Sequence, residues 1–315
     1  MGCPHLTLEE RYQFHALLVA ELPMTTISAE LGRNRSSLID ELKRCDRRRD
    51  YCPVRAQAHR DASKARSAAN APRKPDRMVR EVRKRLEQDW SPEQISGRRQ
   101  LLGHARYSTQ AIYDLVQREG WEDQLRQTQM RAHLRRPARK PWSGSSLSIH
   151  ERPREALSRL TIGHWETDTM VGKRRDRQRV LVSVERQSLY VVLRRLPRPE
   201  SQLAARLIRH DLKDSGLPFL SVAHDRGSEF TALGEALPNA AFACDANQPN
   251  QRGTGENTIG LCRQYHPKGQ TLAKTKQGQL KREQDKLNHR PRKSLGYLTP
   301  HEVMFNCPPT VGTRS

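Results

Sequence analysis

The chain has 315 residues, of which 57 are Lys or Arg and 35 are Asp or Glu, giving a formal net charge of +22. This length accommodates two or three domains. The positive charge indicates a polyanionic partner, with nucleic acid ranked before an acidic membrane. No apolar run approaches the roughly 18 residues that span a bilayer, and the N-terminal residues do not resemble a secretory signal. We therefore expect no membrane partner and a cytoplasmic location.

The cysteines give no sign of a metal or disulfide framework. Six cysteines are scattered along the chain, and none forms a C-x-x-C pair. Cys45 and Cys52 have no matching His or Cys pair at zinc-finger spacing. The sequence therefore predicts reduced thiols and excludes both a disulfide scaffold and a zinc finger.

Residues 1–50 predict a helix-turn-helix DNA-binding domain. Thr7 with Glu10 has capping-box spacing for a helix to about Ala20. Its core-facing stripe is expected at Leu8, Tyr12, His15 or Ala16, and Val19. A short helix over 26–31 ends at Gly32, and Asn34 caps a basic helix through Arg44. The expected DNA contacts are Arg33, Asn34, Arg35, Ser36, Ser37, Lys43 and Arg44. The alternative is an ordinary three-helix bundle with a solvated basic face.

A second helical domain, resembling a helix-turn-helix, is predicted over residues 76–132. Met78, Val82 and Leu86 form one apolar stripe, and Ser91 followed by Pro92 marks the start of the next helix. A basic connector over 51–75 separates this domain from the first. A Pro-, Ser- and Gly-containing basic linker over 133–158 is expected to separate it from the rest of the chain.

Residues 159–315 predict an α/β domain. The segment HWETDTMVG alternates like a strand, and the apolar runs at 180–184 and 189–193 complete a three-strand meander. A helix over 200–213 is followed by an apolar strand over 219–223, which ends at His224 and Asp225. Sites in α/β sheets lie at the carboxyl ends of strands. Another strand over 241–244 and a long helix opening near Thr254 are expected after it.

Three carboxylates on three of these elements indicate a site for divalent metal. Asp168 lies on the first strand, Asp225 ends a later strand, and Glu256 opens the long helix. Hard oxygen ligands suit Mg²⁺. Without a metal ion, a buried group of three carboxylates would repel one another and the DNA. The other carboxylates of this span, Glu166 and Glu229 among them, are expected to be solvated.

At these residues the chain resembles the insertion-sequence-thirty family of bacterial DDE transposases over nearly its whole length. The segments that carry the resemblance are HLTLEERYQ, AELGRNRSSL, WSPEQISGR, IGHWETDTMVGK, HDRGSEF, QRGTGENTIGLCRQYHPKG and LNHRPRKSLGYLTPHEV. The resemblance implies helix-turn-helix modules followed by an RNase H-like catalytic domain of the retroviral-integrase type. It also implies a homo-oligomer that binds double-stranded DNA, at the terminal inverted repeats and at the target, on the bacterial nucleoid.

Carried over by position, the family's catalytic and metal-binding residues are Asp168, Asp225 and Glu256. They imply two Mg²⁺ or Mn²⁺ ions, which serve strand cleavage and then strand transfer by the freed 3′-hydroxyl. Substrate contacts are expected around the glutamate, at Arg252, Asn257, Arg263, Gln264, Tyr265 and Lys268.

The chain departs from the family pattern close to the site. Arg226 stands where Asn is usual, Gly255 stands where Asn is common, and the stretch between Asp225 and Glu256 is shorter. One alternative is therefore a catalytically inactive DNA-binding regulator derived from a transposase. Another is a tyrosine recombinase that uses Tyr297 beside His289, Arg290 and Arg292, although that cluster is better interpreted as a basic surface.

Overall fold

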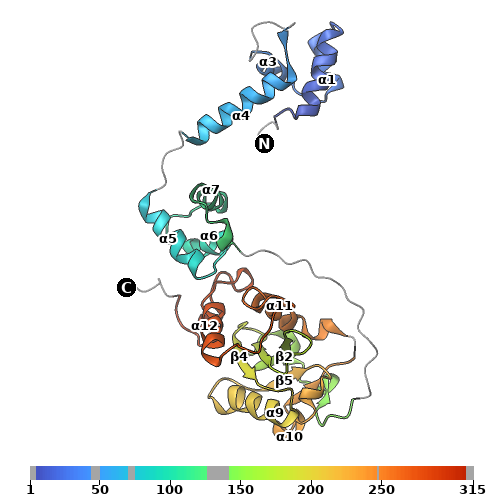
Figure 1. Cartoon of the computed structure of the whole chain (residues 1–315), viewed down its shortest axis with the longest axis vertical. Helices are drawn as coiled ribbons and strands as arrows, with labels where there is room; N and C mark the ends of the chain where they lie inside the picture. Colours follow the sequence, from blue (N-terminus) through green and yellow to red (C-terminus); the bar gives the residue numbers. More distant parts are fainter. Residues whose placement is uncertain (1–4, 44–49, 70–74, 126–141, 247, 310–315) are drawn as a thin grey trace. The chain divides into compact units, whose positions relative to one another are not determined.

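The computed structural model describes residues 5–43, 50–69, 75–125, 142–246 and 248–309 (Figure 1). The chain divides into two compact units, Met1–Lys74 and Pro75–Ser315. The first is helical, and the second combines a helical module with a mixed α/β domain.

Three helices of the first unit follow the predicted order. They are α1 (Leu8–Val19), α2 (Met24–Glu30) and α3 (Arg35–Leu42). Thr7 and Glu10 form the expected capping box at α1, and the Asn34 side chain accepts a hydrogen bond from the Ser36 amide at the start of α3. Gly32 has a φ of +59°, which suits glycine at the turn between α2 and α3. The capping and turn predictions are confirmed.

The buried face of α1 differs from the predicted one. Leu8, Tyr12 and Val19 are 44%, 52% and 68% exposed, whereas the buried residues are Arg11, Phe14 and Leu18. The reason is an internal ion pair: Arg11 Nε lies 2.5 Å from Glu41 Oε1 of α3, with both side chains buried. A buried charge that is paired in this way can occupy a core position that apolar periodicity does not reveal.

The connector predicted over 51–75 is largely a helix. Residues Pro53–Ala69 form α4, which packs against α1. Tyr51 and Ala56 are buried with Phe14 in the core of this unit. The first unit therefore extends past residue 50, because it needs these apolar side chains to close its core.

The helical module of the second unit comprises α5 (Asp76–Glu87), α6 (Pro92–Leu101) and α7 (Thr109–Glu119), with a 3₁₀ turn at Glu122–Gln124. Ser91 and Gln94 form a capping box at α6, and Ser108 caps α7. The core of the module is formed by Met78, Val82, Leu86, Trp90, Ile95, Ile112, Leu115 and Val116. The predicted stripe of α5 is confirmed.

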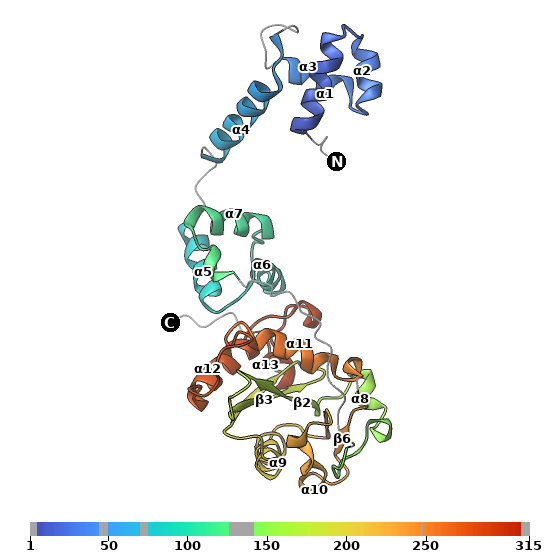
Figure 2. The ribbon, with the colours of Figure 1, turned by 45° about the vertical axis from the view of Figure 1, so that its right-hand side comes forward.

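The α/β domain is built on a six-stranded sheet of order β1-β6-β5-β2-β3-β4. Strands β2, β3 and β6 of this sheet are labelled in Figure 2. Its strands are β1 (Leu147–Ser148), β2 (His164–Val171), β3 (Arg179–Glu185), β4 (Val191–Leu196), β5 (Ser221–His224) and β6 (Ala241–Ala243). Strands β2, β3 and β4 pair antiparallel, which confirms the predicted meander. Strands β1, β6, β5 and β2 pair parallel, so a crossover connects β4 to β5.

Helices cover both faces of this sheet (Figure 1). On one face α9 (Ser201–Arg209), continued by a π-helical turn at His210–Asp214, and α10 (Leu233–Ala236) enclose a core around Trp165. On the other face α11 (Gly253–Cys262) and α12 (Gln277–Asn288) enclose a core around Met170. Side chains alternate along a strand, so Asp168 shares the face of Met170 and of α11.

Residues 142–158, predicted to be linker, belong to the α/β domain. Strand β1 pairs with β6, and the Ser145 amide donates to the Thr231 carbonyl at 3.1 Å. A 3₁₀ turn (Ile149–Glu151) and α8 (Glu155–Ser158) follow. The composition of this segment does not support independent folding, but it gains backbone partners from strand β6 and from Thr231. The remainder of the predicted linker, 133–141, lies outside the described residues.

The C-terminal segment joins the helical module to the α/β domain within the second unit. After α12 come a 3₁₀ turn (Lys293–Leu295) and α13 (Pro300–Met304). Arg98 of α6 forms an ion pair with Glu302, and both side chains are 4% exposed. Before α6, Asp89 Oδ2 accepts a hydrogen bond from the Tyr265 hydroxyl at 2.8 Å. The module and the α/β domain are thus connected by buried polar contacts.

Within the described ranges no helix is long and apolar enough to cross a membrane. The four cysteines in these ranges, Cys52, Cys244, Cys262 and Cys307, are free thiols.

Candidate active site

Asp168 lies within β2, and Asp225 directly follows the end of the adjacent parallel strand β5. In the register of β2 with β5, Glu166 is opposite Ala223. Asp168 follows two residues later on the same face of β2, and Asp225 follows β5 directly. Strand β5 ends beside the middle of β2, so the parallel register brings together two carboxylates that are distant in sequence.

The Arg252 guanidinium lies between these two aspartates. Its Nη1 is 2.6 Å from Asp168 Oδ2, and its Nη2 is 3.9 Å from Asp225 Oδ2. Arg252 is 5% exposed, and its Nε is buried without a hydrogen-bond partner among the described residues. Arg252 was expected to contact substrate, but here it is the internal counter-ion of the aspartate pair.

Burial and charge oppose each other at this cluster. Burial raises the pKa of the Asp168 carboxyl above its ordinary value, the Arg252 guanidinium opposes this effect, and the neighbouring Asp225 adds to it. Burial lowers the pKa of the Arg252 guanidinium, but the two aspartates outweigh that effect and raise it overall. Two carboxylates held close together in a poorly solvated place need a cation to remain ionised.

Glu256 lies in the first turn of α11, half-buried. Arg252 is the residue at which this helix begins, so Glu256 follows it by about one helical turn. Within the described part of the chain, no three His, Cys, Asp or Glu side chains gather closely enough to hold a metal ion. The fold therefore brings together two of the three predicted carboxylates and places the third on the neighbouring helix.

A buried glutamate fixes the start of α11. Glu166, 1% exposed on β2, accepts a hydrogen bond from the Gly255 amide at 2.8 Å. It also forms an ion pair with Arg186 at 3.4 Å. The unpaired amides and the dipole of a helix N-terminus favour a carboxylate at this position. Glu166 thus attaches α11 to the strand that carries Asp168.

The loop after β5 is held by short polar contacts. Asp225 Oδ1 accepts a hydrogen bond from the Gly227 amide at 2.9 Å. Glu229, buried nearby, accepts from the Thr169 hydroxyl at 2.6 Å and forms an ion pair with Arg179 at 2.5 Å. A Cβ atom on Gly227 would lie 2.8 Å from both the Asp225 and the Glu229 carboxylates. A side chain at this position would force one or both of these carboxylates to move.

His224 supports the same loop from within the core. Its Nδ1 lies 2.7 Å from the Asp225 carbonyl oxygen, and its Nε2 lies 2.8 Å from the Ser146 hydroxyl. Burial lowers the pKa of this imidazole to about 4. A neutral ring that donates from Nδ1 and accepts at Nε2 satisfies both contacts, which fixes its tautomer.

Glu166 and Glu229 were expected to be solvated, but both are buried and paired. The alternation along β2 could have identified Glu166, because it shares a strand face with Asp168. The placement of Glu229 depends on Arg179 and Thr169 of other strands, and no local pattern reports that. Arg226, a departure from the family pattern, donates from Nε to the Cys244 carbonyl at 3.0 Å, at the end of β6.

Three more of the residues predicted to contact substrate around the glutamate have hydrogen-bond partners within the protein. Arg263 donates to the Val171 carbonyl at 3.0 Å, and burial lowers the pKa of its guanidinium. Gln264 accepts a hydrogen bond from Arg290 at 3.2 Å, and the Tyr265 hydroxyl donates a hydrogen bond to Asp89. Two of the set, Asn257 and Lys268, are exposed.

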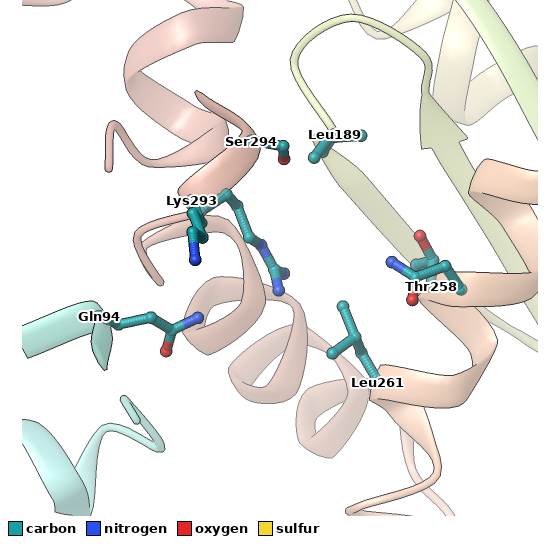
Figure 3. A pocket seen from close by; sticks show the side chains of 8 residues that line it. Gln94, Leu189, Thr258, Leu261, Lys293 and Ser294 are labelled. Atoms are coloured by element: carbon teal, nitrogen blue, oxygen red, sulfur yellow. The ribbon is translucent and has the colours of Figure 1, made fainter. Parts of the chain in front are cut away.

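Asn257 borders a cavity of about 460 Å³ beside α11 (Figure 3). The lining residues come from α6, α11, the β3–β4 turn and the C-terminal segment. They are Gln94, Leu189, Asn257, Thr258, Leu261, Arg292, Lys293 and Ser294. The cavity mixes amide, hydroxyl, cationic and aliphatic groups, and it adjoins the helix turn that bears Glu256.

In the first unit, the predicted DNA contacts differ in how available they are. Arg33 pairs with Glu10 of α1 at 2.6 Å. Asn34 and Ser36 bond to each other at the cap of α3. Arg35 is exposed, Ser37 is half-buried, and exposed Lys43 pairs with Asp40. Arg44 lies outside the described residues.

The aspartate pair suits a divalent cation. Carboxylate oxygens are the ligands that Mg²⁺ and Mn²⁺ prefer. The structure already places one cationic group, the Arg252 guanidinium, against both carboxylates. Asp168 and Asp225 therefore fit such an ion, and Glu256 is the predicted ligand on α11.

No family model matches the chain. The transposase of insertion sequence element IS4351 from Bacteroides fragilis is 32% identical over 314 residues, covering 95% of this chain and 94% of that protein. Transposase InsI of IS30A from Escherichia coli is 34% identical over 327 residues, covering 95% and 83%. The transposase of IS1086 from Cupriavidus metallidurans is 32% identical over 318 residues, covering 94% and 93%.

Among solved structures, the catalytic core domain of BIV integrase is similar, with a TM-score of 0.35 and 20% identity. The similarity covers 45% of this chain and 93% of the integrase chain. The sequence relatives identify the class of protein, which is the transposases of bacterial insertion sequences. Within that class the chain belongs to the IS30 family.

Proposed function

We propose that this transposase cleaves DNA at the terminal inverted repeats of its own insertion sequence and joins the freed ends to target DNA. The catalytic domain is RNase H-like, and its site consists of Asp168, Asp225 and Glu256 with two Mg²⁺ or Mn²⁺ ions. The observation that carries the proposal is the convergence of Asp168 and Asp225 on one cationic group where β5 ends beside β2.

The roles of the side chains follow from their positions. Asp168 and Asp225 would hold the metal, and Glu256 would complete the ligand set from α11. Divalent ions bound there would supply charge stabilisation for phosphoryl transfer. Glu166 keeps the start of α11 against β2, and neutral His224 holds the backbone of Asp225. The protein needs no covalent link to DNA.

We also propose that the first unit is the helix-turn-helix that contacts the inverted repeat. Its support is the order of α2, the turn at Gly32 and α3, which is followed directly by Lys43. Arg35 is exposed in the first turn of α3, where side chains of a recognition helix contact base edges. Lys43 and Lys268 are placed for phosphate contacts, and Asn257 for a DNA strand at the cavity beside α11. The module α5–α7 is a second DNA-binding element.

Because two element ends must be held together, we propose that the protein acts as a homo-oligomer on double-stranded DNA. A DNA substrate of this kind places it in the bacterial cytoplasm, on the nucleoid. Its high net positive charge supports affinity that decreases as salt rises.

The test is strand cleavage and joining by the purified chain on labelled DNA that carries the element's end. Reactions contain Mg²⁺, Mn²⁺ or EDTA, and each is repeated with Asp225→Asn. A matched control is Asp214→Asn, because Asp214 is 48% exposed and lies in the turn after α9. We expect metal-dependent nicking in the wild type and in the Asp214 variant, and none in the Asp225 variant.

Repeat binding is measured in the same samples by gel shift. If Asp225→Asn binds the repeat but does not nick it, the site assignment stands. If the wild type binds without nicking in either metal, the chain is instead a DNA-binding regulator derived from a transposase. Nicking that survives Asp225→Asn contradicts the assignment of the catalytic residues.

A further inference from the structure

Arg252 competes with a divalent ion for the same oxygens. Its Nη1 lies 2.6 Å from Asp168 Oδ2, so it occupies one face of the atom that a metal would approach to about 2.1 Å. Its Nη2 lies 3.9 Å from Asp225 Oδ2. A guanidinium in this position fills the space between the two carboxylates.

Charge reinforces this steric conflict. One guanidinium leaves the two aspartates with a net charge of −1, whereas one divalent ion neutralises them. Arginine remains protonated under all ordinary conditions, so it cannot relieve repulsion by losing its proton. A metal ion and the Arg252 guanidinium therefore repel each other in a place that water screens poorly.

The backbone around Arg252 allows a change confined to its side chain. The preceding residue, Gln251, is fixed by two hydrogen bonds to Asp245, of 2.8 and 2.9 Å. The following helix is held by Glu166 at the Gly255 amide. The Arg252 Nε has no hydrogen-bond partner among the described residues, so only the two terminal nitrogens tie the side chain to the aspartates.

We propose that Arg252 is a positioning residue that holds Asp168 and Asp225 together in the metal-free protein and must leave them when a divalent ion binds. This inference rests on the proposed active site. It also explains why a residue in the family's substrate-binding segment is buried here: the guanidinium becomes available to DNA phosphates only after the metal has displaced it. Metal binding and the position of Arg252 are thus coupled.

The test measures Mn²⁺ binding by the full-length chain without DNA. Binding is monitored by calorimetry and by the electron paramagnetic resonance signal of free Mn²⁺. Arg252→Gln removes the charge and retains much of the length. We expect it to bind Mn²⁺ roughly tenfold more tightly than the wild type, the size of effect typical of coupled sites. Its melting temperature without metal falls, because the aspartates lose their counter-ion, and its gain on adding Mn²⁺ exceeds that of the wild type.

Two further variants separate this coupling from general effects. Arg226→Gln removes a neighbouring guanidinium that contacts Asp245 and the end of β6. We expect it to leave Mn²⁺ affinity unchanged. Arg252→Lys keeps the charge but shortens the reach, and we expect an affinity between those of the wild type and Arg252→Gln. If Arg252→Gln does not fold, the comparison rests on Arg252→Lys, and wild-type affinity in that variant overturns the inference.

Asp168→Asn distinguishes the two levels of the argument. If this variant loses Mn²⁺ binding while Arg252→Gln binds as the wild type does or more weakly, the displacement of Arg252 is wrong and the proposed active site is retained. If Asp168→Asn binds Mn²⁺ like the wild type, the aspartate pair is not the metal site, and the proposed function loses its chemical basis together with this inference.

Discussion

The Arg98 guanidinium of helix α6 donates to both carboxylate oxygens of Glu302, with an Nη1–Oε2 distance of 2.8 Å. The two residues are far apart in the sequence, because Arg98 belongs to the helical module and Glu302 to α13. Glu302 is also the capping-box partner of Thr299, and Arg98 also donates to the Tyr297 carbonyl at 3.1 Å. One ion pair thus connects the helical module to helix α13 of the same unit.

Replacing Arg98 by Ala is expected to lower the free energy of unfolding by about 3–5 kcal/mol, because it leaves the Glu302 carboxylate buried without its partner. Urea unfolding followed by circular dichroism measures the change. The control is Arg198→Ala, which breaks an ion pair with Glu200 at the surface, where the Arg198 side chain is 72% exposed. That variant is expected to lose less than about 1 kcal/mol. Equal losses in the two variants would contradict a structural role for the buried pair.

Gly97 is predicted not to tolerate a side chain. A Cβ atom there would lie 2.3 Å from ring atoms of Tyr297, well inside contact distance. We expect Gly97→Ala to destabilise the protein by about 1–3 kcal/mol through overpacking, measured by the same unfolding experiment. Combining it with Tyr297→Ala should cost less than the sum of the single changes, since the second change removes the ring. Additive losses would show that the two residues are not in contact.

Gly227 is predicted to be required for activity. A methyl group on it would lie 2.8 Å from the Asp225 and Glu229 carboxylates, although its φ of −73° is open to any residue. We expect Gly227→Ala to reduce strand cleavage on the order of 100-fold by displacing Asp225. Gly253→Ala is the matched control, because no atom lies within 4 Å of its added Cβ. Loss of cleavage in the control alone would refute the prediction.

Tyr297 is predicted to have no chemical role. Its ring packs against Gly97 and its carbonyl accepts from Arg98, so its position is explained by the fold. We expect Tyr297→Phe to retain cleavage and strand joining, because the ring contact remains. Denaturing gels of the reaction should contain no protein–DNA adduct. Trapping such an adduct in the wild type, and losing it in Tyr297→Phe, would instead support a tyrosine recombinase.

The stability of the C-terminal segment is predicted to depend on pH through His301. Its ring stacks on that of His289, with centroids 4.8 Å apart, and lies beside Tyr190 and Phe305. Burial lowers the pKa of His301 below its usual value near 6.5, and repulsion from His289 adds to this effect. The unfolded chain then binds more protons than the folded one, so stability is lost as pH falls through about 6.5.

We therefore expect the melting temperature to fall between pH 7.5 and pH 5.5, and the slope to decrease in His301→Gln. The control is His104→Gln, which replaces an exposed imidazole in the helical module. A slope unchanged by His301→Gln, or reduced equally by His104→Gln, would show that another group carries the pH dependence.

Several features of the structure were predictable from the sequence because their causes are local. Thr7 with Glu10, and Ser91 with Gln94, form capping boxes within three residues of each other. The alternation of β2 and the apolar stripe of α5 follow from one element's own periodicity. The three predicted metal ligands, Asp168, Asp225 and Glu256, were inferred from motifs that resemble those of the family to which the chain belongs.

Tertiary structure decided what depends on partners far along the chain. Arg11 is buried in α1 because Glu41 neutralises it, and residues 147–148 form a strand because β6 offers a free edge. Arg252 turns inward because the fold brings Asp168 and Asp225 together beneath the start of α11. A hydrogen bond within one helical turn can be inferred from residues that are neighbours in the sequence. Burial of a charge cannot, because its free energy depends on a counter-charge that only the folded chain supplies.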